Sequence, residues 1–386
     1  MRVLYVNHTA QVSGGERSLL ILLESIAGEA QVVVAAPRGP LWDAVQALGI
    51  ETAEIRGTAG SMRLHPLHTP RALGEMSLAA AELSAIARRN RPDVVHANSI
   101  RGGIVAGLTP LHGAARVVHV RDCLPPGPAT TATMRLIAAR ADVVIANSSY
   151  TARFVAQHAP RASISVVHNP VDMRRFDPAL VARADMRKRL GAGADGCVLL
   201  GVVAQLSPWK GQETAIEALR ILRSEGVDAQ LLLIGSAKFT AQGTRFDNEA
   251  YVRRLHALVA RHALQDHVAW LGEREDVPDL VGALDVLLLP SQEEPFGRAL
   301  IEAMALEVPV IATDVGGPPD ILAQGREGYL LAPGQPELWA QGVRRILESP
   351  DHGAAMGRAG RERVLDAFTP QRHVEQVLSL YRRATA

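Results

Sequence analysis

The chain is poor in cysteine, in net charge and in long apolar runs, and each shortage excludes a class of protein. Cys123 and Cys197 are too few and too widely separated for a disulfide framework or a cysteine metal site, so we expect a reducing compartment. A formal net charge of +1 over 386 residues gives no electrostatic reason for a nucleic-acid partner. No apolar run approaches the length of a transmembrane helix.

The start of the chain also lacks the pattern of a secretory signal. Met1 and Arg2 lead directly into the apolar segment 3–6, which is too short for the apolar core of such a signal. We therefore expect a cytoplasmic protein, with peripheral contact to the inner face of the membrane left open. The oligomeric state is left open as well.

Several ligand-binding motifs are missing. The sequence contains no P-loop, no cysteine–histidine cluster with zinc spacing, and no Asp-x-Asp pair of the kind that holds a nucleotide sugar through a divalent metal. Segment 191–196 matches the dinucleotide fingerprint by its letters, yet it precedes a strand and therefore reads as a loop. We expect neither a metal nor a cofactor.

What the chain does contain is a regular alternation of short β-rich runs with helical patterns. The first series of runs is 3–6, 32–36, 94–96, 117–120, 143–146 and 164–167; the second is 198–203, 230–234, 268–271, 286–289 and 310–312. This rhythm is typical of parallel sheets covered by helices, and the length exceeds that of one ordinary core. The sequence therefore predicts an α/β protein with two Rossmann-like, doubly wound parallel-sheet domains.

The predicted domains comprise residues 1–172 and 173–369, with a linker rich in turn-forming residues around 168–178. We expect the last helix, about residues 370–386, to pack back on the first domain. Because open parallel sheets bind ligands outside the carboxyl ends of their strands, we expect the two domains to face each other across a cleft.

The most informative segment is 291–305, which places two carboxylates eight positions apart around the start of one helix. An apolar strand pattern precedes it, so Gly297 lies at a strand-to-helix turn. Such a turn presents backbone N–H groups and the positive end of a helix dipole, which suit a phosphate. Glu294 and Glu302 are then placed to bind hydroxyl groups on either side of that phosphate, as a nucleotide-linked sugar requires.

Two glycine-containing turns offer further groups for a phosphate. Lys210 and Gly211 follow the first strand of the second series, where the lysine can neutralise a diphosphate through a charge-assisted hydrogen bond that contributes roughly 1.5–3 kcal/mol. Gly14 and Gly15 follow the first strand of the chain and let the backbone approach a ligand closely. Taken alone, each is more often a turn without a ligand; for Lys210, the Glu294 segment favours the phosphate interpretation.

Polar residues at strand ends of the first domain are candidates for chemistry and acceptor binding. His119 lies near the end of a strand, which would put its imidazole at the rim of the predicted cleft; a structural histidine is the alternative. Arg121 follows it, and Asn98 and Ser99 end the preceding strand, where they can hydrogen-bond an acceptor. Residues 147–148 occupy the equivalent place one strand later but read as a helix cap.

The acceptor itself is not identified by the sequence. The stretch 56–71 carries Arg63, His65, His68 and Arg71 among glycines and prolines, and such a loop could meet an anionic or lipid-phosphate acceptor. A surface loop without a ligand is the alternative that we favour.

Taken together, these residues resemble the retaining glycosyltransferases of family 4 (group 1), which have the two-domain GT-B fold and transfer a sugar from a nucleoside diphosphate. The resemblance covers nearly the whole chain, and its most specific part is Glu294-Pro-Phe-Gly297 with Glu302, which matches the family's E-x7-E pattern. The supporting parts are Gly14-Gly15, 169–176, Lys210-Gly211, 309–313 and 316–320.

The resemblance implies a metal-independent transfer with retention of anomeric configuration. It implies two catalytic residues: Glu294, which contacts the hydroxyls of the donor sugar, and His119, which matches a histidine near sugar and acceptor. The donor-binding residues that it implies are Gly14, Gly15, Gln205, Lys210, Glu273, Arg274, Phe296, Gly297, Arg298 and Glu302. We expect a UDP-sugar as donor, with GDP or TDP as alternatives, and a small molecule, glycan or lipid-linked hydroxyl as acceptor.

One donor position departs from the family's pattern. The family usually has an arginine five positions before the lysine, where this chain has Gln205. A neutral amide cannot replace that charge, so we hypothesise that Arg298 supplies it.

Three alternative functions stay open: a nucleotide-sugar epimerase, a phosphorylase on the same fold, and a sugar-binding protein that closes on its ligand without reaction. The E-x7-E segment argues against the epimerase, and the lack of an obvious cofactor lysine argues less firmly against the phosphorylase. A cationic phosphate site would serve no purpose in a sugar-binding protein that catalyses no reaction.

Overall fold

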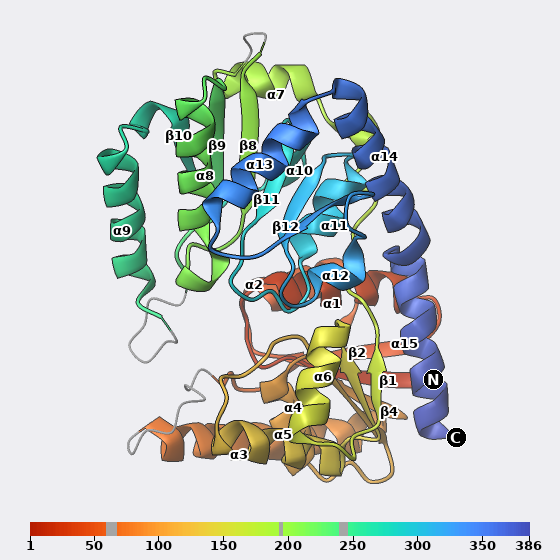
Figure 1. The fold of residues 1–386 in the computed structure, drawn as a ribbon. Helices are drawn as coiled ribbons and strands as arrows, with labels where there is room; N and C mark the ends of the chain where they lie inside the picture. Colours follow the sequence, from red (N-terminus) through yellow and green to blue (C-terminus); the bar gives the residue numbers. More distant parts are fainter. Residues whose placement is uncertain (59–67, 193–195, 239–245) are drawn as a thin grey trace. The chain divides into compact units, whose positions relative to one another are not determined.

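The structure is a computed structural model that describes residues 1–58, 68–192, 196–238 and 246–386. The chain divides into two compact units: unit 1 comprises Met1–Pro170 with Pro370–Ala386, and unit 2 comprises Val171–Thr369. The boundary between the units lies after Pro170, two residues before the boundary that the sequence analysis predicts after residue 172. Arg63 and His65 of the candidate acceptor loop lie outside the described residues. Figure 1 follows the chain through both units by colour.

Unit 1 is built on a seven-stranded sheet in the order β3-β2-β1-β4-β5-β6-β7, with every pair of neighbouring strands parallel. Its strands are β1 (Arg2–Val6), β2 (Gln31–Ala36), β3 (Glu51–Glu54), β4 (Val94–Ala97), β5 (Ala115–Val120), β6 (Val143–Ala146) and β7 (Ile164–Val166). Most are apolar along their whole length because helices cover both faces of a parallel sheet.

Two groups of helices cover these faces (Figure 1). The helices of unit 1 are α1 (Gly14–Ile26), α2 (Pro40–Ala47), α3 (His68–Asn90), α4 (Ile100–Leu108), α5 (Pro128–Arg140), α6 (Ser149–His158) and α15 (Pro370–Thr385). Helices α3 to α6 share one apolar core with the sheet, whereas α1, α2 and α15 share the other. The C-terminal helix is fixed to β1 by a hydrogen bond of 2.9 Å from the Tyr381 hydroxyl to that of Tyr5.

Unit 2 repeats this architecture with a six-stranded parallel sheet in the order β10-β9-β8-β11-β12-β13. The strands are β8 (Val198–Val203), β9 (Ala229–Ile234), β10 (Val268–Gly272), β11 (Val286–Leu289), β12 (Val310–Thr313) and β13 (Gly328–Leu331). The helices are α7 (Arg183–Arg189), α8 (Gln212–Ser224), α9 (Asn248–Arg261), α10 (Val277–Gly282), α11 (Arg298–Ala305), α12 (Pro318–Ile321), α13 (Pro336–Leu347) and α14 (Pro350–Ala367). Helices α7, α10 and α11 pack on one face, and α8, α9 and α13 on the other.

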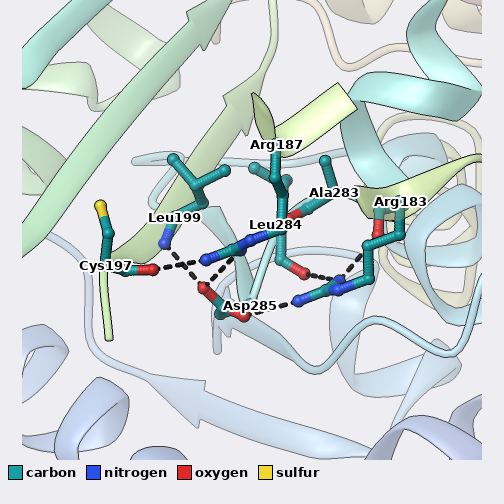
Figure 2. Close-up of polar contacts among 8 residues, drawn as sticks. Arg183, Arg187, Cys197, Leu199, Ala283, Leu284 and Asp285 are labelled. Carbon is teal, nitrogen blue, oxygen red and sulfur yellow. Dashed lines mark hydrogen bonds and ion pairs between the residues drawn. The ribbon is translucent and has the colours of Figure 1, made fainter. Parts of the chain in front are cut away.

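An arginine network fastens α7 to the amino edge of the unit 2 sheet, as Figure 2 shows. Asp285, just before β11, accepts hydrogen bonds from Arg183 Nη2 at 2.6 Å, Arg187 Nη1 at 3.0 Å and the Leu199 N–H at 2.8 Å. The two guanidinium groups also donate to the backbone carbonyls of Cys197, Gly282, Ala283 and Leu284. These bonds satisfy carbonyls at the end of α10 and just before β8 and β11, so the network stabilises the fold.

The predicted fold class is confirmed, although two strands escape the sequence pattern. Both β3 and β13 lie at sheet edges. The four residues of β3 include two exposed glutamates and bury only Ala53. Strand β13 begins with Gly328, where a side chain would meet the Val310 carbonyl oxygen at 2.6 Å. Within the described residues, no helix is both long enough and apolar enough to cross a membrane.

Candidate functional site

Three loops of unit 2 meet where β8, β11 and β12 end at the carboxyl edge of the sheet. The Gln292 N–H, after β11, donates to the Trp209 carbonyl, after β8, at 2.8 Å. Two glycines allow the backbones to approach: a Cβ on Gly211 would lie 1.9 Å from the Pro290 oxygen, and one on Gly316 would lie 2.0 Å from the Glu294 oxygen. Both glycines have positive φ, so any other residue there would be strained and would also push the loops apart.

An ion pair between Lys210 and Glu294 lies where these loops meet. The Lys210 Nζ is 2.6 Å from Oε2 of Glu294, and the two side chains are 14% and 9% exposed. The Ser291 hydroxyl donates to the same carboxylate oxygen at 3.1 Å, and the ammonium lies 4.3 Å from the centre of the Trp209 ring. An ammonium carries three N–H donors, so Lys210 can hold this carboxylate and also bind an oxygen of a ligand.

Helix α11 begins beside this pair without a capping side chain. Its N-cap is Gly297, in the left-handed region with φ of 108°, which has no side chain that could cap the first turn. Arg298 opens the helix and pairs with Glu302 one turn later, with 2.7 Å between Nη2 and Oε1. A helix start of this kind offers backbone N–H groups and a positive dipole end to an anion.

Two predicted donor residues, Phe296 and Gln205, differ in how far their side chains are exposed: Phe296 is buried, whereas Gln205 is half-buried. The Phe296 ring is 2% exposed and packs edge-on against Phe368 in the core, so the predicted donor contact of Phe296 would be made by its backbone. The structure shows no hydrogen bond from the side chain of Gln205 among the described contacts of that loop, while its carbonyl accepts one from Gln212.

The predicted donor-binding residues Glu273 and Arg274 follow β10 and are paired within unit 2. Glu273 accepts a hydrogen bond of 2.8 Å from the Ser236 hydroxyl and lies 3.0 Å from the Lys238 ammonium. Arg274 binds Asp276 through two hydrogen bonds of 2.8 and 2.7 Å, which hold the pKa of that carboxyl below its usual value. These pairs fix the shape of the loop after β10.

In unit 1, the structure brings Gly15, Arg121 and Asn98 together at the carboxyl edge of the sheet. A Cβ on Gly15 would lie 3.2 Å from Cδ of Arg121, so the small residue leaves room for the arginine. The guanidinium donates twice to Oδ1 of Asn98, at 3.1 and 2.9 Å, and also to the Asn169 amide oxygen. Arg121 is 7% exposed, and neutral amides supply these contacts. Gly14 is the first residue of α1.

Serines at two strand ends cap helices. The Ser148 hydroxyl accepts from the Thr151 N–H, which confirms the predicted cap of α6. The Ser99 hydroxyl accepts from the Gly102 N–H at 3.1 Å and lies 2.9 Å from Nδ1 of His8. Ser99 therefore has a structural task at the start of α4, in addition to the acceptor contact that the sequence predicts.

His119 is not placed as predicted. Its side chain is fully buried on the face of β5 that α15 covers, with its ring centre 6.5 Å from that of His373 and 5.7 Å from that of His96. Because side chains alternate along a strand, His119 shares this face with Val117, while Val118 and Val120 face the opposite core. Neither ring nitrogen has a hydrogen-bond partner within the described chain, and burial lowers the pKa well below its usual value. A role in direct contact with substrate remains only a prediction.

Sequence reasoning missed residues that hold the loops in place. Ser291 binds Glu294, and Gln212 with Tyr251 contacts the start of the Lys210 loop. For Gln212 the sequence offers only a weak indication of such a role, because it is a polar residue directly after Gly211. Tyr251 lies 39 positions away on another helix, and no spacing rule links the two. Among the residues that the structure describes, no group of three or more histidine, cysteine, aspartate or glutamate side chains is arranged to hold a metal ion.

Two family models match the chain, one in each half. The model described as "Glycosyltransferase Family 4" matches residues 12–175, and the model described as "Glycosyl transferases group 1" matches residues 186–363. The second match contains all of the loops after β8, β11 and β12.

Named relatives support the same family. The chain is 32% identical over 286 residues to D-inositol 3-phosphate glycosyltransferase of Streptomyces avermitilis, covering 69% of this chain and 60% of that protein. It is 31% identical over 273 residues to the GDP-mannose-dependent alpha-(1-6)-phosphatidylinositol monomannoside mannosyltransferase of Mycobacterium tuberculosis H37Rv, covering 67% of each. A 2-deoxystreptamine glucosyltransferase of Streptomyces kanamyceticus is 31% identical, over 66% of this chain and 64% of its own. Both Streptomyces alignments thus span less than two thirds of the relative's length.

Solved structures share the fold over almost the entire chain. HepE of Anabaena, crystallised with UDP, aligns with a TM-score of 0.84 at 23% identity, covering 99% of this chain and 100% of that one. Sucrose-phosphate synthase of Thermosynechococcus elongatus aligns with a TM-score of 0.80 at 22% identity, covering 99% and 98%. The two parallel-sheet units therefore have the GT-B fold.

Proposed function

Because the chain belongs to the family 4, group 1 glycosyltransferases, we propose that it transfers a sugar from a nucleoside diphosphate to an acceptor hydroxyl. The observation that carries this proposal is the Lys210–Glu294 ion pair beside the uncapped start of α11. A cation, the N-terminal end of a helix and two carboxylates in one place suit a ligand that combines a diphosphate with hydroxyl groups.

Each carboxylate in this site is paired with a cation that a diphosphate would attract. When the donor binds, Lys210 and Arg298 take phosphate oxygens as partners, together with the first N–H groups of α11. Glu294 then accepts hydrogen bonds from hydroxyls of the sugar, and Glu302 from those of the ribose. In this arrangement Arg298 supplies the charge that Gln205 lacks.

The reaction needs charge stabilisation more than a protein nucleophile. The acceptor oxygen bonds to the anomeric carbon as the bond from that carbon to the diphosphate breaks on the same face, and the acceptor proton passes to a leaving phosphate oxygen. Lys210 and the α11 N–H groups stabilise the negative charge that develops on the diphosphate. We propose retention of configuration on this basis, with Lys210 and Arg298 in the role that a divalent metal has in other transferases.

The donor and acceptor classes follow from the family. We propose UDP as the nucleotide, with GDP or TDP as alternatives, since HepE is crystallised with UDP and a relative is named as GDP-mannose-dependent. We propose a polyol acceptor, because two relatives are named for inositol phosphate and 2-deoxystreptamine, which are ring polyols. Asn98 and Arg121 of unit 1 stay the proposed acceptor-binding residues, as the sequence predicts.

The test is a transfer assay with UDP-, GDP- and TDP-sugars and a polyol panel in the presence of a metal chelator. Mass spectrometry should detect a glycosylated polyol, NMR should show that the anomeric configuration of the donor is kept, and Lys210→Gln should abolish the product. The alternatives give other products: an epimerised donor, a sugar phosphate made from a glycan and inorganic phosphate, or tight binding with no product. Any of these would overturn the proposal.

A further inference from the structure

Two buried side chains connect helix α9 to the loop that carries Lys210. The Tyr251 hydroxyl donates to Oε1 of Gln212 at 3.1 Å, and Nε2 of Gln212 donates to the Gln205 carbonyl at 2.9 Å. Tyr251 is 1% exposed and Gln212 is completely buried. A buried amide is costly unless both of its ends are hydrogen-bonded, so these two bonds are what make Gln212 tolerable there.

These two bonds act on one end of a loop that is fixed at its other end. Gln205 lies two residues after β8, and Gly211 closes the loop against the Pro290 carbonyl. Between these points the Leu206 N–H donates to the Ser236 carbonyl at 3.0 Å, and the Trp209 carbonyl accepts from Gln292. The Lys210 side chain therefore starts from a backbone that is held at several points, and the Gln212 side chain supplies one of them.

We propose that Gln212 and Tyr251 are positioning residues for Lys210, an inference that rests on the proposed nucleotide-sugar transfer. Neither side chain is exposed to a ligand. They keep the Gln205 carbonyl in place, and through the loop they keep the ammonium of Lys210 at 2.6 Å from Glu294 and in reach of the diphosphate. Displacing a charged group by about 1 Å can cost on the order of 100-fold in catalysis, so a modest loop shift is enough to be measured.

The first test removes each hydrogen bond while keeping the shape of the side chain. Tyr251→Phe deletes only the hydroxyl, and Gln212→Met replaces the amide by an apolar group of similar length. We expect the dissociation constant for UDP, or for whichever nucleoside diphosphate the wild type binds, to rise about 3- to 10-fold in Tyr251→Phe and at least as much in Gln212→Met. Calorimetric titration without divalent metal measures both.

A matched control comes from the far edge of the same sheet. The Tyr329 hydroxyl, in β13, lies 3.2 Å from Nε2 of His352, so Tyr329→Phe also deletes one hydroxyl hydrogen bond in unit 2. Nucleotide affinity should be unchanged in this variant. If Tyr329→Phe weakened binding as much as Tyr251→Phe, general loosening of unit 2 would explain both and the proposal would fail.

A double-mutant cycle separates positioning from a merely structural role. Because Tyr251 acts through Lys210, adding Tyr251→Phe to Lys210→Gln should cause no further loss of nucleotide affinity. An equal fold-loss in both backgrounds would overturn the proposal, as would unchanged affinity in Tyr251→Phe. If Gln212→Met fails to fold, Tyr251→Phe still decides the matter, since it keeps the buried ring.

The outcomes also distinguish this inference from the proposed function. If the wild type binds no nucleoside diphosphate, both fail. If the wild type binds one and Lys210→Gln weakens it, while Tyr251→Phe has no effect, then only the positioning role is wrong.

Discussion

Unit 2 has two charged networks at opposite edges of one sheet, and they differ in what their donors bind. At the amino edge, Asp285 holds Arg183 and Arg187, and each arginine also donates to backbone carbonyls (Figure 2). At the carboxyl edge, the described hydrogen bond of the Lys210 ammonium goes to Glu294. Donors that are bound to the backbone cannot leave without breaking the fold, whereas a carboxylate partner can be exchanged for a phosphate. The comparison suggests that the first network provides stability and the second provides binding.

The largest effect should come from Lys210→Gln, which removes the charge but keeps an N–H donor for Glu294. We expect kcat/KM for sugar transfer to fall at least about 100-fold, because the lysine stabilises the departing diphosphate. Because the pair is only 14% and 9% exposed, the free energy of unfolding in urea should fall too, by roughly 1–2 kcal/mol, which is below the 3–5 kcal/mol of a broken buried pair because glutamine keeps a donor for Glu294. Unchanged activity in a folded Lys210→Gln protein would show that this ion pair, like the Asp285 network, serves stability.

Asp285→Asn should show the opposite result. It leaves Arg183 and Arg187 without their carboxylate, and since the Asp285 side chain is 23% exposed we expect a loss of roughly 2 kcal/mol, below the 3–5 kcal/mol of a fully buried pair. Denaturant unfolding measures this, and the dissociation constant for the nucleotide should not change. Weakened nucleotide binding in a folded Asp285→Asn protein would show that the two edges are coupled.

Arg298→Ala tests the second cation of the carboxyl edge. If Arg298 compensates for Gln205, its loss should weaken nucleotide binding about 10-fold, which corresponds to about 1.4 kcal/mol. Adding Gln205→Arg to this variant should restore part of the affinity. Calorimetry on the two variants decides the question, and an unchanged affinity in Arg298→Ala would refute the compensation.

The smallest expected effect is the pH dependence of stability that comes from buried histidines of unit 1. At the carboxyl edge of that unit, Arg121 binds the neutral amides of Asn98 and Asn169, whereas Lys210 in unit 2 binds a carboxylate. Burial, with a further contribution from Arg121, lowers the pKa of His373 to about 3, whereas an unfolded histidine titrates near its usual 6.5. Below pH 6.5 the unfolded chain therefore binds a proton that the folded chain does not, and stability falls with pH until about pH 3. Between pH 7 and 5.5 this amounts to about 1 kcal/mol for His373.

His373→Gln should flatten this pH dependence by about one proton, as measured by urea unfolding at several pH values. The pKa values of His96 and His119 are also lowered, mainly by burial, so part of the pH dependence of stability should remain in this variant. An identical slope in wild type and His373→Gln would show that this histidine is already protonated in the folded protein.

The sequence predicted what depends on local patterns and missed what depends on packing between distant segments. Apolar runs identified the central strands because parallel strands are buried on both faces, and the turn at Gly297 was visible as a glycine between a strand and a helix. The burial of His119 was not visible, because α15, which covers it, lies about 250 positions later in the chain. For the same reason the contact between Tyr251 and Gln212 could not be predicted from spacing.

The measurement that tests the central claim most directly is a calorimetric titration of wild type and Lys210→Gln with UDP, GDP, TDP and ADP in the presence of a chelator. We predict that the wild type binds one of these nucleotides, with UDP the first expectation, and that the variant binds it at least about 10-fold more weakly. If the wild type binds none of them, or if Lys210→Gln binds as tightly as the wild type, the carboxyl edge of unit 2 is not a donor site of the kind proposed here.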